Sequence, residues 1–198
     1  EHWWMDDLPS NDWINNGGNF NNTNHIHESI HDPYLSVFEK NLFTDGWFVK
    51  SMPDLNQRNE LLETYLIQNS IWWIEYANLS GFRVDTYPYV DKNFLSTWSM
   101  RISSEYPNFN FVGEEWNNNP TIVSYWQKDS PTHDDYVSFI PSMMDFPLQS
   151  AIVKGLKEKE SWNSGIGNIF RVLANDFQYG NPYSCLLYTS PSPRDKRQ

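Results

Sequence analysis

Three charged side chains near the middle of the sequence have types and spacing that could support two-carboxylate chemistry. Arg83 and Asp85 lie two residues apart in the run 82–86, which is typical of a short strand. Because side chains alternate across a strand, Arg83 and Asp85 point to the same side. A guanidinium beside a carboxylate favours the ionised carboxylate, which suits a nucleophile. The same spacing is also typical of a structural salt bridge, so spacing alone leaves both interpretations open.

A second carboxylate, Glu114, ends the next predicted strand, which covers residues 110–114. The interval between Asp85 and Glu114 fits one helix between two parallel strands, whose C-terminal ends would bring the two carboxylates together. Two carboxylates about 5–5.5 Å apart are the arrangement of retaining glycosidases. Such a pair would supply one carboxylate that attacks the anomeric carbon and one carboxyl that protonates the leaving oxygen and then activates water. The pleat turns the adjacent Glu115 away from Glu114, and we predict a structural role for it.

The segments around these carboxylates predict strands alternating with helices, which is typical of an α/β fold with parallel βαβ units. Asn59 is a candidate N-cap for a helix over residues 60–77, in which Trp72 and Trp73 are predicted to be core side chains. A third, weaker strand is expected at 143–146. The other expected helices cover residues 92–105, 121–127, 148–157 and 167–177.

Residues 9–33 are rich in Asn and are predicted to form a long, packed, functional loop. His25, His27 and His31 lie close together in it. Zinc usually needs paired ligands at tighter spacing and a fourth partner, so we predict a polar loop and assign no metal ligand. Asp and Asn oxygens, which calcium prefers, are abundant, but no EF-hand-like spacing is present.

The composition excludes some classes of partner. The 198 residues include 25 acidic and 14 basic side chains, giving a net charge of −11. Such a surface repels phosphate backbones, so we expect no nucleic-acid partner, and no apolar run is long enough to span a membrane. The chain is rich in aromatic residues, with 10 Trp, 11 Tyr and 12 Phe. Rings of this kind can build a core, or can offer an apolar face and a polar tip to a sugar.

Four segments together resemble glycoside hydrolase family 13, the α-amylase family. The run Gly81–Asp85 resembles the nucleophile motif of that family, and Phe111–Glu114 resembles its acid/base strand. Met52–Asn56 resembles a subfamily marker that is mixed between the oligo-1,6-glucosidase and neopullulanase types, and Met144–Leu148 resembles the segment that follows in the family. A narrower resemblance, to neopullulanase/cyclomaltodextrinase-like enzymes of bacterial starch-utilisation systems, is carried by residues 2–5, 12–15 and 124–128.

The resemblance covers about residues 1–183 and implies both a fold and an activity. The implied fold class is α/β, a partial (β/α)8 TIM barrel with only its middle strands and helices, because a complete barrel needs about 250 residues. The implied activity is retaining hydrolysis of α-glucans such as starch oligosaccharides, cyclodextrins and pullulan, with Asp85 as the nucleophile, Glu114 as the general acid/base and Arg83 orienting Asp85. The resemblance also keeps calcium as a candidate ion, with no ligand assigned. Tyr89 and Trp116, which follow the two carboxylates, are expected to be substrate-binding side chains. The implied location of the parent protein is periplasmic or secreted.

The sequence departs from the family pattern in three ways. The third catalytic Asp, which follows Asn-His in the family, and the earlier Asp-to-Asn-His motif are both absent, so we expect a fragment that is inactive alone. Pro88 and Tyr89 replace a usual Lys-His, which leaves bond preference open. Residues 184–198, which hold Cys185, are Ser/Pro-rich and then basic, and are expected to be an artefactual or disordered tail. The alternative function is a non-catalytic carbohydrate-binding protein with an amylase-like barrel.

Overall fold

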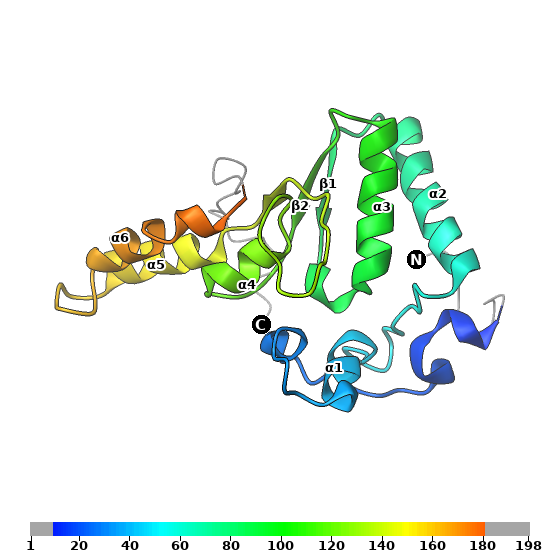
Figure 1. The fold of residues 1–198 in the computed structure, drawn as a ribbon, viewed down its shortest axis with the longest axis horizontal. Helices are drawn as coiled ribbons and strands as arrows, with labels where there is room; N and C mark the ends of the chain where they lie inside the picture. The colour runs from blue at the N-terminus through cyan, green and yellow to red at the C-terminus, as the bar shows by residue number, and fades with distance from the viewer. Residues whose placement is uncertain (1–9, 181–198) are drawn as a thin grey trace.

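The computed structural model describes residues 10–180, which form a three-stranded parallel sheet flanked by helices (Figure 1). The strands are β1 (Gly81–Val84), β2 (Asn110–Gly113) and β3 (Ser142–Met143), in the order β1-β2-β3. Each connection between neighbouring strands carries a helix, because parallel strands need a crossover rather than a hairpin. The predicted motif at residues 2–5 and the predicted tail at 184–198 lie outside the described residues.

The register of the sheet brings the ends of β1 and β2 level with each other. Val84, the last residue of β1, pairs with Gly113, the last residue of β2. Gly113 also pairs with Met143 of β3. A Cβ atom at Gly113 would lie 2.8 Å from the Met143 sulfur, so glycine leaves room here for the Met143 side chain. The residues that follow Val84 and Gly113 therefore emerge at one edge of the sheet.

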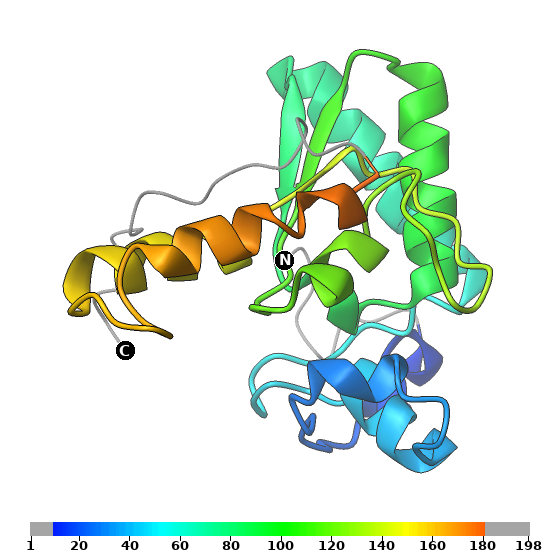
Figure 2. The same cartoon turned by 60° about the vertical axis from the view of Figure 1, so that its left-hand side comes forward.

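Two long helices before and after β1 agree with the sequence prediction. They are α2 (Glu60–Ala77) and α3 (Lys92–Glu105). The Asn59 side chain accepts hydrogen bonds from the first free backbone amides of α2, and Asp91 does the same for α3. The two helices pack side by side along the sheet, as Figure 1 and Figure 2 both show.

The later elements differ from the prediction at their ends. The third strand was expected at 143–146, but β3 stops at Met143 because Asp145 instead caps α5 (Phe146–Lys157), accepting a hydrogen bond from the Leu148 amide. The remaining helices are α1 (Val37–Thr44), α4 (Pro120–Tyr125) and α6 (Gly167–Leu173), the last followed by a 3-10 turn, η6 (Asp176–Gln178). Helices α5 and α6 pack on each other and extend away from the sheet (Figure 1 and Figure 2).

The prediction that Trp72 and Trp73 are core side chains of α2 was wrong. Trp72 is 49% exposed and Trp73 is 39% exposed, and the Trp72 ring stacks on the exposed Tyr76. The stripe of α2 that is buried within the described chain instead includes Leu62, Ile67 and Ile74. Large aromatic residues at helical spacing predicted the wrong side of the helix, because smaller aliphatic side chains make the contact with the core.

The hydrophobic core lies where α2 and α3 cover the sheet and where the segment after α4 folds back. Trp98 of α3 packs edge-on against Phe111 of β2, with ring centroids 5.0 Å apart. The other large buried members of this cluster are Ile67, Ile74, Tyr87, Phe94, Leu95, Ile102, Phe109, Val123, Tyr125, Trp126, Tyr136, Ile140, Met143 and Tyr179. No helix within residues 10–180 is long and apolar enough to cross a bilayer.

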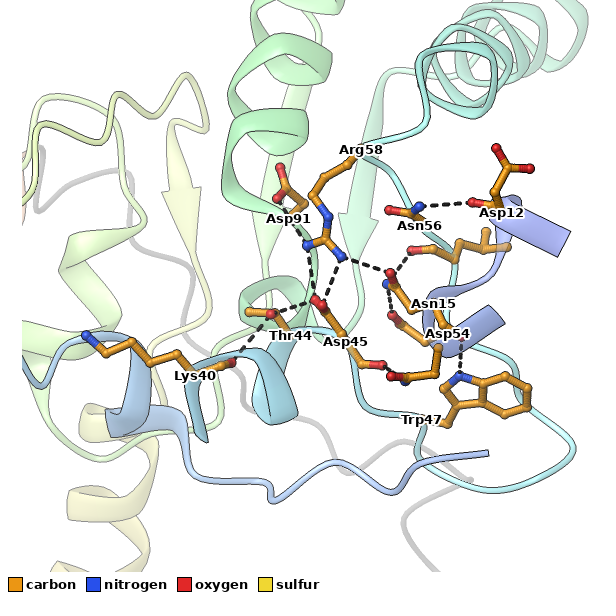
Figure 3. A network of polar contacts seen from close by, with 12 residues as sticks. Asp12, Asn15, Lys40, Thr44, Asp45, Trp47, Asp54, Asn56, Arg58 and Asp91 are labelled. Atoms are coloured by element: carbon orange, nitrogen blue, oxygen red, sulfur yellow. Dashed lines mark hydrogen bonds and ion pairs between the residues drawn. The ribbon is translucent and has the colours of Figure 1, made fainter. Parts of the chain in front are cut away.

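A network of polar side chains fixes the N-terminal segment to the start of α2 and α3 (Figure 3). The Arg58 guanidinium donates two hydrogen bonds to the Asp45 carboxylate, at 3.1 and 2.9 Å, and one to Asn15 Oδ1 at 2.8 Å. Its Nη1 also lies 3.8 Å from the Asp91 carboxylate that caps α3. Asn15 in turn donates to Asp54 at 2.7 Å. The predicted packed loop is therefore held in place by directional contacts at Asn15.

Asp54 makes this network sensitive to pH. Burial raises the pKa of Asp54 from 3.8 to about 7, although the hydrogen bond from Asn15 acts in the opposite direction. The folded protein therefore keeps this proton at a pH where the unfolded chain has lost it, so stability falls as the pH rises from about 4 towards 7. Asp54→Asn removes the titration while keeping an acceptor for Asn15.

Between pH 5 and pH 8, the wild type should lose about 2 kcal/mol of unfolding free energy that Asp54→Asn does not lose. Urea unfolding of both proteins at the two pH values measures this change. Asp32→Asn, which makes the same substitution at an exposed position of the N-terminal segment, is the matched control. An equal difference between Asp54→Asn and wild type at both pH values would contradict the assignment.

Candidate active site

One guanidinium group contacts both predicted catalytic carboxylates. Arg83 lies on β1 and Asp85 follows that strand directly, so both side chains lie on the same side of the backbone. Arg83 Nη1 donates to Asp85 Oδ1 at 3.1 Å, and Nη2 donates to Glu114 Oε1. The Asp85 and Glu114 carboxyls are themselves close enough for a hydrogen bond between them. The structure thus brings together the three residues predicted from spacing.

Glu114 is held tightly at the end of β2. Its backbone amide donates to the Val84 carbonyl at 3.0 Å, which continues the pairing of the two strands. Its side chain accepts hydrogen bonds from the Thr86 amide at 3.0 Å and from Trp116 Nε1 at 2.6 Å. Only 4% of the residue is exposed. A carboxyl with this number of fixed contacts has a single orientation relative to Asp85.

The electrostatics of the two carboxylates differ because their exposure differs. Burial raises the pKa of Glu114, and the hydrogen bond with Asp85 raises it further, while the contacts from Trp116 and Thr86 act in the opposite direction. The Asp85 side chain, in contrast, is 69% exposed and is paired with Arg83. A buried carboxyl with a raised pKa suits a proton donor, and an accessible carboxylate beside a cation suits a nucleophile.

The turn after Asp85 places a backbone donor in the site. Thr86 has φ = +47°, a left-handed conformation that a β-branched residue rarely adopts. This conformation allows the Thr86 amide to reach Glu114, and it returns the chain so that the Tyr87 amide donates to the Glu114 carbonyl at 3.1 Å. Strained backbone of this kind is concentrated at functional sites. Sequence reasoning missed this contact, because no residue type signals it.

Trp116 and Tyr89, the two predicted sugar-binding residues, have different environments. Trp116 is 58% exposed, packs against Phe146 with ring centroids 4.7 Å apart, and contacts Glu114, so its free face is available beside the carboxylates. Tyr89 is 8% exposed and stacks on Phe43 at 4.3 Å. Its hydroxyl contacts His25 and His27, so the ring belongs to the packing and offers little surface to a sugar.

The three histidines of the N-terminal segment lie in two separate places. His25 and His27 both contact the Tyr89 hydroxyl, whereas His31 Nδ1 lies 3.2 Å from His133 Nε2. Burial, together with the neighbouring His133, lowers the pKa of His31 to about 4. Among residues 10–180, no group of three or more His, Cys, Asp or Glu side chains is arranged to hold a metal ion.

The Trp116 contact gives a direct test of the electrostatics. Trp116→Phe keeps an aromatic ring against Phe146 but removes the Nε1–H donor that favours ionised Glu114. We therefore expect the pKa of Glu114 to rise in this variant. Carbon-13 NMR titration of the side-chain carboxyls, with Glu114→Gln to assign the resonance, measures it. An unchanged or lower pKa would show that Trp116 does not act on this carboxyl.

Comparison with known proteins agrees with this geometry. The family model of the α-amylase catalytic domain matches residues 12–165 of the chain. Alpha-amylase 2 of Dictyoglomus thermophilum is 33% identical over 125 residues, which cover 56% of this chain and 22% of that protein. The intracellular maltogenic amylase of Bacillus subtilis (strain 168) is 33% identical over 69 residues, covering 35% of this chain and 12% of the relative. The chain therefore spans less than a quarter of either relative's length.

Solved structures show the same architecture. The α-amylase of Geobacillus thermoleovorans, solved with acarbose, superposes with a TM-score of 0.68 and 25% identity, covering 92% of this chain and 35% of that one. The maltogenic amylase from S. marinus superposes with a TM-score of 0.53 and 21% identity, covering 85% of this chain and 24% of that one. The three parallel strands and their helices are thus part of a (β/α)8 barrel, and the chain belongs to the α-amylase catalytic-domain family.

Proposed function

We propose that the protein containing this chain is a retaining glycoside hydrolase that cleaves α-glucosidic bonds through a covalent glycosyl-enzyme. The observation that carries the proposal is the contact of Arg83 with both Asp85 and Glu114, two carboxyls of very different burial at adjacent strand ends. Family membership supports the same class of chemistry. Retaining glycosidases need one carboxylate to attack and one carboxylic acid to protonate the leaving oxygen.

In the first step, the Asp85 carboxylate attacks the anomeric carbon, and the bond between that carbon and the glycosidic oxygen breaks. Protonated Glu114 gives its proton to that oxygen, so the leaving sugar departs as a neutral alcohol. In the second step, Glu114 takes a proton from water as the water oxygen bonds to the anomeric carbon and Asp85 is released. Arg83 holds both carboxyls in place. It also stabilises the negative charge, which lies on Asp85 before the first step and on Glu114 after it.

The proposed substrates are α-glucans such as starch oligosaccharides, cyclodextrins and pullulan. The names of the relatives, amylases and a cyclomaltodextrinase, support this class of substrate. The exposed face of Trp116 beside Glu114 gives an apolar platform for a sugar ring. The net charge of −11 favours neutral over polyanionic polymers. When a second sugar replaces water in the second step, the same residues carry out transglycosylation.

Substitution of the two carboxyls separates their roles in the full-length protein. Asp85→Asn should abolish turnover, because an amide is a poor nucleophile. Glu114→Gln should lose about 10²- to 10⁴-fold in kcat on maltooligosaccharides but much less on aryl glycosides whose leaving groups need no proton. Release of reducing sugar and of the aryl group measures the two rates.

Glu105→Gln, an exposed carboxylate at the end of α3, is the control and should behave as wild type. Equal losses on both substrate types in Glu114→Gln would remove Glu114 as the acid. Full activity in Asp85→Asn would remove Asp85 as the nucleophile. Sugar binding without turnover in the wild-type protein would favour the alternative, a non-catalytic carbohydrate-binding protein.

The raised pKa of Glu114 predicts the pH profile. A general acid must be protonated in the free enzyme, so kcat/KM on maltooligosaccharides should fall as the pH rises through the pKa of Glu114, which lies above 4.5. This alkaline limb should move to higher pH in Trp116→Phe, where a contact that lowers the pKa is lost. A limb that stays in place in Trp116→Phe would mean that another group controls it.

A further inference from the structure

Glu115, the residue after the acid/base, is a fully buried carboxyl that the proposed chemistry does not use. Its exposed fraction is 0%, and burial raises its pKa. The pleat directs its side chain away from the Asp85–Glu114 pair and towards the N-terminal segment. There Glu115 Oε1 lies 2.5 Å from His27 Nδ1, and Oε2 accepts a hydrogen bond from Trp126 Nε1 at 3.0 Å. Burying a carboxyl costs free energy because the group loses its hydration. A fully buried carboxyl of this kind therefore suggests that it has a role in the fold or in the site.

The contacts continue beyond His27 as a directed chain of hydrogen bonds. His27 Nε2 lies 3.1 Å from the Tyr89 hydroxyl, which lies 3.2 Å from His25 Nδ1. In one assignment of hydrogens that fits these contacts, His25 Nδ1–H donates to Tyr89, the Tyr89 hydroxyl donates to His27, and His27 Nδ1–H donates to Glu115.

This chain of contacts joins segments that are far apart in the sequence. His27 begins the 3-10 turn η4 (His27–Ile30) in the N-terminal segment, and Tyr89 ends η5 (Tyr87–Tyr89), which directly follows the strained turn at Thr86. Glu115 follows Glu114 just past the end of β2, and Trp126 directly follows α4. The ring of His27 also packs edge-on against Tyr89, with centroids 5.2 Å apart. The Glu115 carboxylate thus fixes the backbone on both sides of the catalytic pair.

We propose that Glu115 and His27 are positioning residues for the general acid/base: their buried contact fixes the backbone at Glu114 and Thr86, and so holds the Glu114 carboxyl against Asp85 and Arg83. The inference rests on the proposed function, because it assigns Glu114 the role of acid. Neither residue touches the reacting atoms. A displacement of about 1 Å in a catalytic group is enough to lose on the order of 100-fold in rate, so a distant anchor can control the chemistry.

The test compares His27→Leu with His27→Asn in the full-length protein. Leu removes the donor to Glu115, whereas the Asn amide nitrogen lies close to the place of Nδ1 and can still donate. We expect His27→Leu to lose about 10- to 100-fold in kcat on maltooligosaccharides with little change in KM, and His27→Asn to recover most of it. Glu115→Gln should lose a similar factor, and the double variant with His27→Leu should lose no more than the single ones.

Aryl glycosides with good leaving groups separate positioning from plain destabilisation. If the pair acts through Glu114, the loss on these substrates should be several-fold smaller than on maltooligosaccharides, because they need less acid catalysis. Loss of folded protein would lower both rates by the same factor. Glu75→Gln changes an exposed carboxyl that accepts a hydrogen bond from the Tyr106 hydroxyl near the end of α2, and should change neither rate.

Equal losses on both substrate types in His27→Leu, or no rescue by Asn, would overturn the inference. If Glu115→Gln does not fold, the His27 pair alone decides, since His27 is 16% exposed in its side chain and can be replaced at lower cost. Full activity in His27→Leu would also overturn the inference. The proposed function fails in a different way, when Glu114→Gln itself loses as much on aryl glycosides as on maltooligosaccharides.

Discussion

The parallel pairing of β1 with β2 is the constraint on which the whole site depends. Val84 pairs with Gly113, so Asp85 and Glu114 are the residues that directly follow two adjacent strands, at the edge where those strands end. A slip of one residue would turn one of the two carboxyls to the other face of the sheet. The caps at Asn59 and Asp91, the packing of α2 on α3, and the close approach allowed by Gly113 all stabilise this register.

Different degrees of burial then give two chemically similar side chains different properties. Glu114 lies under Trp116 and the Thr86 turn, whereas Asp85 is open to solvent beside the same guanidinium. The environment, rather than the residue type, thus raises the pKa of Glu114. Just past the end of β2, the contact of Glu115 with His27 connects this strand end to a segment 88 residues earlier. The strand ends that carry Asp85 and Glu114 are therefore tied to the N-terminal segment as well as to each other.

Local signals made much of this arrangement predictable. The Asn59 cap, the bounds of α2 and α3, and the spacing of Arg83, Asp85 and Glu114 depend on contacts within a few residues or on the alternation of a strand. The exposed Trp72 and Trp73, the end of β3 at Met143 and the burial of Tyr89 depend on which elements meet in space. The contact of His27 with Glu115 is of the same kind, since neither residue type nor spacing links a loop histidine to a distant strand end.

The most direct measurement of the central claim is identification of the residue that carries the sugar during turnover. The full-length protein is incubated with a fluorinated glycosyl fluoride that forms the glycosyl-enzyme quickly but releases it slowly, and is then digested and analysed by mass spectrometry. The account predicts one added glycosyl unit on Asp85, formed in wild type and absent in Asp85→Asn. A label on another residue, or turnover of natural substrate with inversion at the anomeric carbon, would contradict it.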